Sequence, residues 1–170
     1  MPKMSDDIRE ILRMAYQVEV DGYTFYSMVA DQAEQPAVQE LFDKLARDET
    51  EHKAYLKNVM LNYEEQGTEA FNVGKRDPVL KDFAATILTE KFKKEAKTAE
   101  FEMGALSIGM TLETNAIRVF STAAQNADEN EVREFYQFLA DWEKEHLNSL
   151  QELHKSVRQD MWAEGGFSPF

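Results

Sequence analysis

Two segments with one pattern, LARDETEHKAYL (residues 45–56) and LADWEKEHLNSL (residues 139–150), indicate how this chain folds. In each, leucines at both ends and steps of three and four residues mark one face of a helix, and a Glu-x-x-His pair interrupts that face. Sliding the sequence by 94 residues places 5–60 on 99–154 without a gap. We therefore predict two copies of one helical hairpin, related by a pseudo-two-fold axis.

Apolar residues continue at helical spacing on both sides of these segments. They predict four long helices, at about 5–33, 37–65, 99–127 and 129–160. The first two are joined by a few residues around Pro36 and the last two by Asn126–Asn130, so each pair should be antiparallel.

A long connection separates the two hairpins. Residues 66–78 are rich in turn formers, and Val79–Lys97 is predicted to form an extra helix. The fold class is therefore all-α, a four-helix bundle with one long crossover. We expect the bundle domain to span residues 1–160 and a C-terminal tail to occupy 161–170, where Gly165 and Gly166 should end any helix.

Composition excludes several classes of protein. The 170 residues carry 32 acidic and 19 basic side chains, a net charge of −13, which argues against a nucleic acid or an anionic membrane as partner. The absence of cysteine excludes disulfides, thiolate zinc sites, iron–sulfur clusters and a catalytic cysteine. No signal peptide or membrane helix is apparent, so a cytoplasmic location is expected.

Six polar side chains interrupt the apolar stripes where a core should continue. They are Glu19, Glu49, His52, Glu113, Glu143 and His146. Isolated buried carboxylates are costly, so four that converge require cations. One Glu from each of two helices and Glu-x-x-His from each of the others is the pattern of di-iron and di-manganese bundles. We expect two iron ions, with manganese or zinc as possible substitutes. The alternative, a pair of solvated acidic faces, would also expose the flanking leucines.

With these segments, VEVDGYTFY (18–26) and GMTLETNAIRVF (109–120) make the chain similar to the rubrerythrin branch of the ferritin-like superfamily. The resemblance implies that Glu19 and His52 are terminal ligands of one metal, and Glu113 and His146 of the other. It implies that Glu49 and Glu143 bridge both ions and take part in the reaction as ligands.

The chain departs from this family in two respects. Rubrerythrins proper carry a cysteine-ligated rubredoxin domain, and this chain has no cysteine. A separate electron donor, such as a rubredoxin-type protein, is therefore expected. Those proteins also have a further Glu three residues after the ligand of the third helix. Ala116 occupies this position here and Gly22 is its repeat mate, so the site should be more symmetric.

Three functions are consistent with this pattern. The resemblance implies an oxidoreductase, expected as a homodimer, that reduces hydrogen peroxide or dioxygen. The alternatives are a ferroxidase or iron-handling protein, and a metal-binding bundle without enzymatic activity.

Residues around the six ligand candidates are assigned as follows. Tyr26 is a candidate for a hydrogen bond to a ligand carboxylate or for quenching a radical, and a packed core tyrosine is the alternative. Trp142 is expected to be a packing residue. Asp48, Glu51, Asp141 and Glu145 are expected to be surface charges.

Overall fold

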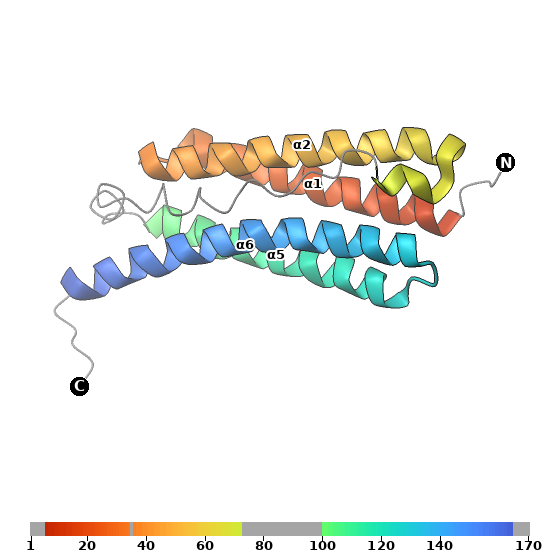
Figure 1. Ribbon diagram of the computed structural model, residues 1–170. Helices are drawn as coiled ribbons and strands as arrows, with labels where there is room; N and C mark the ends of the chain where they lie inside the picture. The colour runs from red at the N-terminus through yellow and green to blue at the C-terminus, as the bar shows by residue number, and fades with distance from the viewer. Residues whose placement is uncertain (1–5, 35, 73–99, 165–170) are drawn as a thin grey trace.

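The computed structural model describes residues 6–34, 36–72 and 100–164. These residues form four long helices and one short 3-10 helix, with the bounds α1 (Asp6–Gln32), α2 (Pro36–Gln66), η1 (Gly67–Asn72), α5 (Glu100–Asn126) and α6 (Asn130–Glu164). The long helices run alongside one another, α1 beside α2 and α5 beside α6 (Figure 1). The predicted all-α bundle of two helical hairpins is confirmed.

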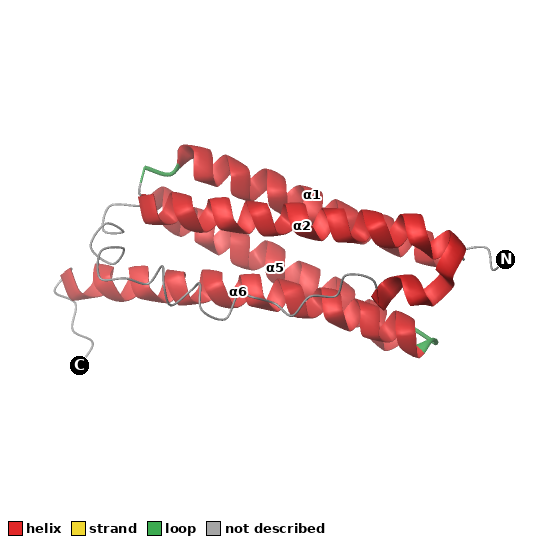
Figure 2. Cartoon of the chain, turned by 45° about the horizontal axis from the view of Figure 1, so that its top comes forward, coloured by secondary structure: helices red, strands yellow, loops and turns green. Residues whose placement is uncertain are grey.

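The internal repeat is visible in the helix boundaries. Helices α1 and α5 have 27 residues each, and they begin at Asp6 and Glu100, which are 94 positions apart. Helices α2 and α6 begin at Pro36 and Asn130, at the same offset. The connection after α1 and the one between α5 and α6 lie at opposite ends of the bundle (Figure 2). The two hairpins are therefore in the same register, and their second helices differ in length, with 31 residues in α2 and 35 in α6.

Some parts differ from the prediction or lie beyond it. Helix α6 continues past residue 160 to Glu164. The predicted helix at Val79–Lys97 and the last residues of the tail, 165–170, lie outside the described residues.

Helix α2 ends where the sequence predicts a turn. Gly67 has a φ of 59°, the left-handed conformation that commonly closes a helix and that glycine adopts without a steric penalty. The chain then forms η1, which was not predicted. Phe71 of η1 stacks on Phe135 of α6 with ring centroids 4.5 Å apart, and its carbonyl accepts a hydrogen bond from the Tyr55 hydroxyl. The short helix thus closes one end of the bundle over its core.

The hydrophobic core consists of two clusters with a polar layer between them. One cluster contains Leu12, Leu56 and Leu139, and the other contains Leu45 and Leu150 among its members. Along each long helix, the chain passes from one cluster to the other through the position of a predicted ligand. The apolar side chains on both sides therefore enclose that layer and keep bulk water away from it.

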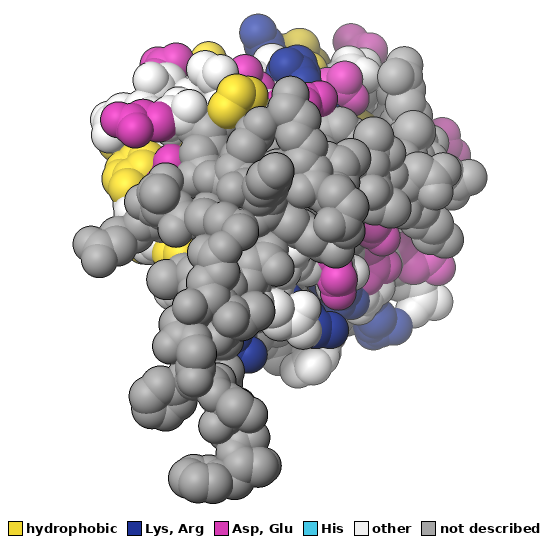
Figure 3. Space-filling view, turned by 90° about the vertical axis from the view of Figure 1, so that its left-hand side faces the viewer, with side chains coloured by type: hydrophobic (Ala, Val, Ile, Leu, Met, Phe, Trp, Pro, Cys, Tyr) yellow, Lys and Arg dark blue, Asp and Glu magenta, His cyan; other side chains and the backbone are white. Residues whose placement is uncertain are grey.

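At the end of the bundle where α1 meets α2, Asp and Glu side chains lie beside Lys and Arg side chains (Figure 3). Among the helices of the described residues, we find none with the length and apolar character needed to cross a bilayer.

Candidate metal centre

All six predicted ligands lie in the layer between the two core clusters. Each long helix contributes its share: Glu19 from α1, Glu49 and His52 from α2, Glu113 from α5, and Glu143 and His146 from α6. Their exposed fractions range from 0% to 7%. The solvated-face alternative is therefore wrong for these residues, since both the polar side chains and the leucines that flank them are buried.

These residues form two groups that share one member. In one group, ligand atoms of Glu49, Glu113, Glu143 and His146 lie within 4.8 Å of one another. In the other, ligand atoms of Glu19, Glu49 and His52 meet the same condition. Because Glu49 belongs to both, the two groups form one continuous centre. Oxygen and nitrogen donors at this density are suited to two divalent ions.

Both histidines turn Nδ1 toward the carboxylates. His52 Nδ1 lies 3.1 Å from Oε2 of Glu19 and 3.1 Å from Oε2 of Glu49. His146 Nδ1 lies 3.4 Å from oxygens of Glu49 and Glu113 and 3.6 Å from Glu143. The Glu-x-x-His spacing explains part of this, because residues three apart project from the same face of a helix.

Several buried polar atoms of the centre have no hydrogen-bond partner among the described residues. They are Oε1 of Glu19, Oε1 of Glu143 and both ring nitrogens of His146. Buried polar atoms of a folded protein are nearly always paired, and each exception requires an explanation. Metal coordination satisfies carboxylate oxygens and an imidazole nitrogen directly, so this donor set fits a pair of cations.

Electrostatics supports the same conclusion. Burial, reinforced by the neighbouring Glu49 carboxylate, raises the pKa of Glu19 from 4.5 to about 8. Burial, together with Glu19 and Glu113, raises the pKa of Glu143 well above its usual range. Burial disfavours a charged His146, but Glu49 and Glu113 outweigh it and raise the pKa of this histidine. Without metal, the centre therefore retains protons to offset its negative charge.

Tyr26 takes part in the centre directly. It is completely buried, and its hydroxyl donates a hydrogen bond to Oε1 of Glu113. Burial and the Glu113 carboxylate raise the pKa of Tyr26, so the phenol stays protonated and remains a donor. The hydrogen bond predicted for Tyr26 is thus present, and its acceptor is one of the candidate ligands. Phe120 is the repeat mate of Tyr26, and it is buried but has no hydroxyl to offer.

Small residues make room for the ligands. A Cβ atom on Gly22 would lie 2.7 Å from Oε1 of Glu49, closer than real Cβ contacts allow. Ala116, at the equivalent position of α5, is buried and has no polar group. Neither position supplies a further ligand, as the sequence predicts.

One neighbour of the candidate ligands lies elsewhere than predicted, and another makes a contact that was not predicted. Asp48 was expected on the surface, but its Oδ2 lies 3.8 Å from Nε2 of His146 and its side chain is only 15% exposed. Trp142 was expected to be a packing residue and does pack against the core, and its indole also stacks on the His52 ring with centroids 3.9 Å apart. Of the other predicted surface charges, Glu51 and Asp141 are exposed. The sequence signal for these two contacts is the repeat itself, in which Asp48 of the first half corresponds to Trp142 of the second.

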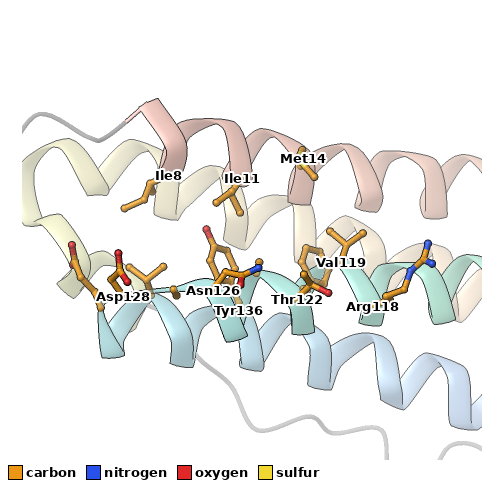
Figure 4. A pocket seen from close by; sticks show the side chains of 14 residues that line it. Ile8, Ile11, Met14, Arg118, Val119, Thr122, Asn126, Asp128 and Tyr136 are labelled. Carbon is orange, nitrogen blue, oxygen red and sulfur yellow. The ribbon is translucent and has the colours of Figure 1, made fainter.

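A separate groove lies away from this centre. It has a volume of about 600 Å³ and is lined by α1, α5 and the start of α6. Ile8, Ile11 and Met14 form one wall, opposite Val119 and Tyr136 (Figure 4). None of the six predicted ligands lines the groove, so it is not part of the candidate centre.

Comparison with models of protein families gives a match over most of the chain. The family model described as Rubrerythrin matches residues 10–154, a range that contains all six buried Glu and His residues. Neither a search of curated proteins nor a search of solved structures gave a match.

Proposed function

The chain belongs to the rubrerythrin family, and from that premise we propose that it reduces hydrogen peroxide or dioxygen at a pair of iron ions, with electrons from a separate donor. The observation that carries the proposal is the sharing of Glu49 by two buried ligand groups. Such sharing is what a two-ion site needs, and a single structural ion would not require the second group.

The ligand roles follow from the two groups. Glu19 and His52 would hold one ion, and Glu113 and His146 the other, because each pair belongs to only one group. Glu49, which belongs to both groups, would bridge the ions. Glu143 belongs to one group only, and its role as the second bridge rests on the resemblance to the family. The iron ions would supply the redox chemistry, passing electrons to the bound oxygen compound and receiving them again from the donor.

The protein controls protons and water around the centre. Reduction of peroxide or dioxygen to water consumes one proton for every electron. Tyr26 keeps a proton on its hydroxyl and directs it at Oε1 of Glu113, so this proton lies beside a ligand oxygen. The two apolar clusters on either side exclude water and strengthen every electrostatic interaction between them.

A separate donor is part of the proposal because the chain has no cysteine. The family's cysteine-ligated electron carrier therefore cannot be part of this sequence. A rubredoxin-type protein or a comparable small carrier would deliver the electrons.

The test is a cycling experiment. Protein freed of metal is given ferrous iron without oxygen, treated with hydrogen peroxide, and then reduced again. We expect a ferric absorption band that appears with peroxide, is bleached by the reductant and returns over several cycles. Peroxide loss no faster than in buffer with free iron would contradict the proposal. Ferric iron that accumulates beyond two ions per chain would instead favour iron storage, the alternative function.

A further inference from the structure

The two histidines of the centre differ in what contacts them from outside. Oδ2 of Asp48 lies 3.8 Å from Nε2 of His146, on the side of the ring away from the ligand carboxylates. His52 has no such carboxylate at Nε2 among the described side chains. Trp142 covers its ring instead, with planes 5° apart.

Asp48 and Trp142 occupy equivalent positions in the two halves of the chain. They lie 94 residues apart, and each directly precedes a proposed bridging glutamate, Glu49 or Glu143. Each reaches across the bundle, Asp48 from α2 to the histidine of α6, and Trp142 from α6 to the histidine of α2. Equivalent positions of the two hairpins thus make chemically different contacts, a carboxylate with His146 and an indole with His52.

Asp48 lies beside the outer nitrogen of His146, at ion-pair distance and beyond hydrogen-bond distance. Both of its carboxylate oxygens lie 2.6 Å from Nζ of Lys44, which holds the carboxylate in place. A carboxylate beside the outer nitrogen of an imidazole favours the tautomer with its proton on that nitrogen, which leaves the inner nitrogen free to bind metal and makes it a stronger ligand. Here the inner nitrogen is Nδ1, which faces Glu49, Glu113 and Glu143.

Trp142 cannot act in this way on His52. The indole has one N–H donor and no acceptor, so it cannot raise the basicity of the imidazole by accepting its proton. It fixes the plane of the ring by stacking, and it is held in turn by Tyr55 and Phe138, whose rings lie 5.1 Å and 4.6 Å from it.

We propose that Asp48 and Trp142 are positioning residues that make the two metal positions unequal, so that the position of His146 binds its ion first and more tightly than the position of His52. The inference rests on the two-metal centre of the proposed function, but not on any particular reaction. It implies that the His52 position exchanges its ion more readily.

Stepwise metal binding tests this directly. Full-length protein without metal is titrated with Co²⁺, followed by calorimetry and by cobalt absorption. We expect two steps in the wild type. Asp48→Ala should lower the affinity of the first step by about 10- to 100-fold and leave that of the second unchanged. Asp48→Asn should have a smaller effect on the first step. Trp142→Ala should lower the affinity of the second step and leave that of the first unchanged.

Two further measurements separate positioning from a general effect on structure. Asp141→Asn removes the same charge from an exposed site beside Trp142 and should change neither step. In the cobalt-loaded protein, NMR should show an exchangeable ring N–H of His146 whose exchange with solvent becomes faster in Asp48→Ala. Circular dichroism of each variant verifies that the helices are intact.

Three results would overturn the inference. They are equal affinity for both ions in the wild type, an unchanged first step in Asp48→Ala, and equal weakening of both steps in that variant. A wild-type protein that binds no cobalt would contradict the metal centre itself and the inference with it, so the two failures are distinguishable.

Discussion

Gly22 of α1 faces Glu49 of α2 so closely that a methyl group on the glycine would lie 2.7 Å from Oε1 of the carboxylate. The atom it would meet is the end of a flexible side chain, so the helices can stay in place while Glu49 moves. Because Glu49 belongs to both ligand groups, a small change at Gly22 acts on the whole centre.

We therefore expect Gly22→Ala to weaken metal binding without unfolding the protein. Alanine is favoured over glycine inside a helix by about 1 kcal/mol, so the free energy of unfolding without metal should fall little or rise. Metal affinity should fall by about tenfold or more, since displacement of Glu49, the proposed bridge, would spoil its distance and angle to both ions. Cobalt titration and urea unfolding measure the two effects separately.

Gly104→Ala is the matched control. Gly104 lies inside α5, and no atom lies within 4 Å of the position its Cβ would occupy. It should gain the same helix stabilisation and keep full metal affinity. Unchanged affinity in Gly22→Ala would show that Glu49 is not a ligand in the position described.

Tyr26→Phe should remove the hydrogen bond to Glu113 and keep the packing. Phe120 at the equivalent position shows that a phenyl ring fits this part of the bundle. Loss of a buried hydrogen bond to a charged group costs about 1.5–3 kcal/mol. We expect that loss in urea unfolding of the metal-free protein, and slower peroxide reduction by the iron-loaded protein.

Tyr55→Phe provides the comparison for this variant. It removes a buried hydroxyl that donates to the carbonyl of Phe71, outside the centre. It should cost about 1 kcal/mol of stability and leave the rate of peroxide reduction unchanged. Equal rates for both variants would mean that the Tyr26 hydroxyl has no part in the reaction.

Stability without metal should decrease as pH rises from about 5 to 8. The pKa of Glu19 is raised to about 8, so the folded protein keeps a proton here that the unfolded chain has already released. The raised pKa of His146 has the same effect at pH values above the usual pKa of a histidine, because the folded protein then keeps a proton that the unfolded chain has lost. Where the folded state binds more protons, the free energy of unfolding falls with increasing pH.

Urea unfolding of chelator-treated protein at pH 5.5 and pH 8 measures this trend. Metal affinity should rise over the same interval, because ions compete with these protons for the ligands. Glu19→Gln, which carries no titratable proton, should flatten the dependence. Increasing stability of the metal-free wild type between the two pH values would contradict the assigned pKa shifts.

Much of the fold could be predicted from the sequence because its signals are local and repeated. Apolar residues in steps of three and four define each helix, and Pro36 and Gly67 lie at the ends of α2. The short helix η1 could not be predicted, since six residues contain too little periodicity. Burial of its Phe71 depends on Phe135, a residue distant in sequence.

The burial and convergence of the six candidate ligands could be predicted for a similar reason, because a carboxylate on an apolar stripe is conspicuous. The role of Asp48 could not, because it lies on the helix about 100° from Glu49 and the packing of α2 against α6 decides whether it faces solvent or His146. The same applies to Trp142, whose contact with His52 joins two hairpins. Gly22 and Ala116 make the two halves alike, since neither side chain can be a ligand. Asp48 and Trp142, which are also repeat mates, make the surroundings of the two histidines different.

The most direct test of the account is the number of ions that Glu49 helps to hold. Wild-type protein and Glu49→Ala are loaded with ferrous iron without oxygen, freed of excess and analysed for metal per chain, with Glu51→Ala as an exposed control on the same helix. The account predicts two ions in the wild type and in the control, and a strong loss at both positions in Glu49→Ala. Two ions retained by Glu49→Ala would contradict a centre that shares this carboxylate.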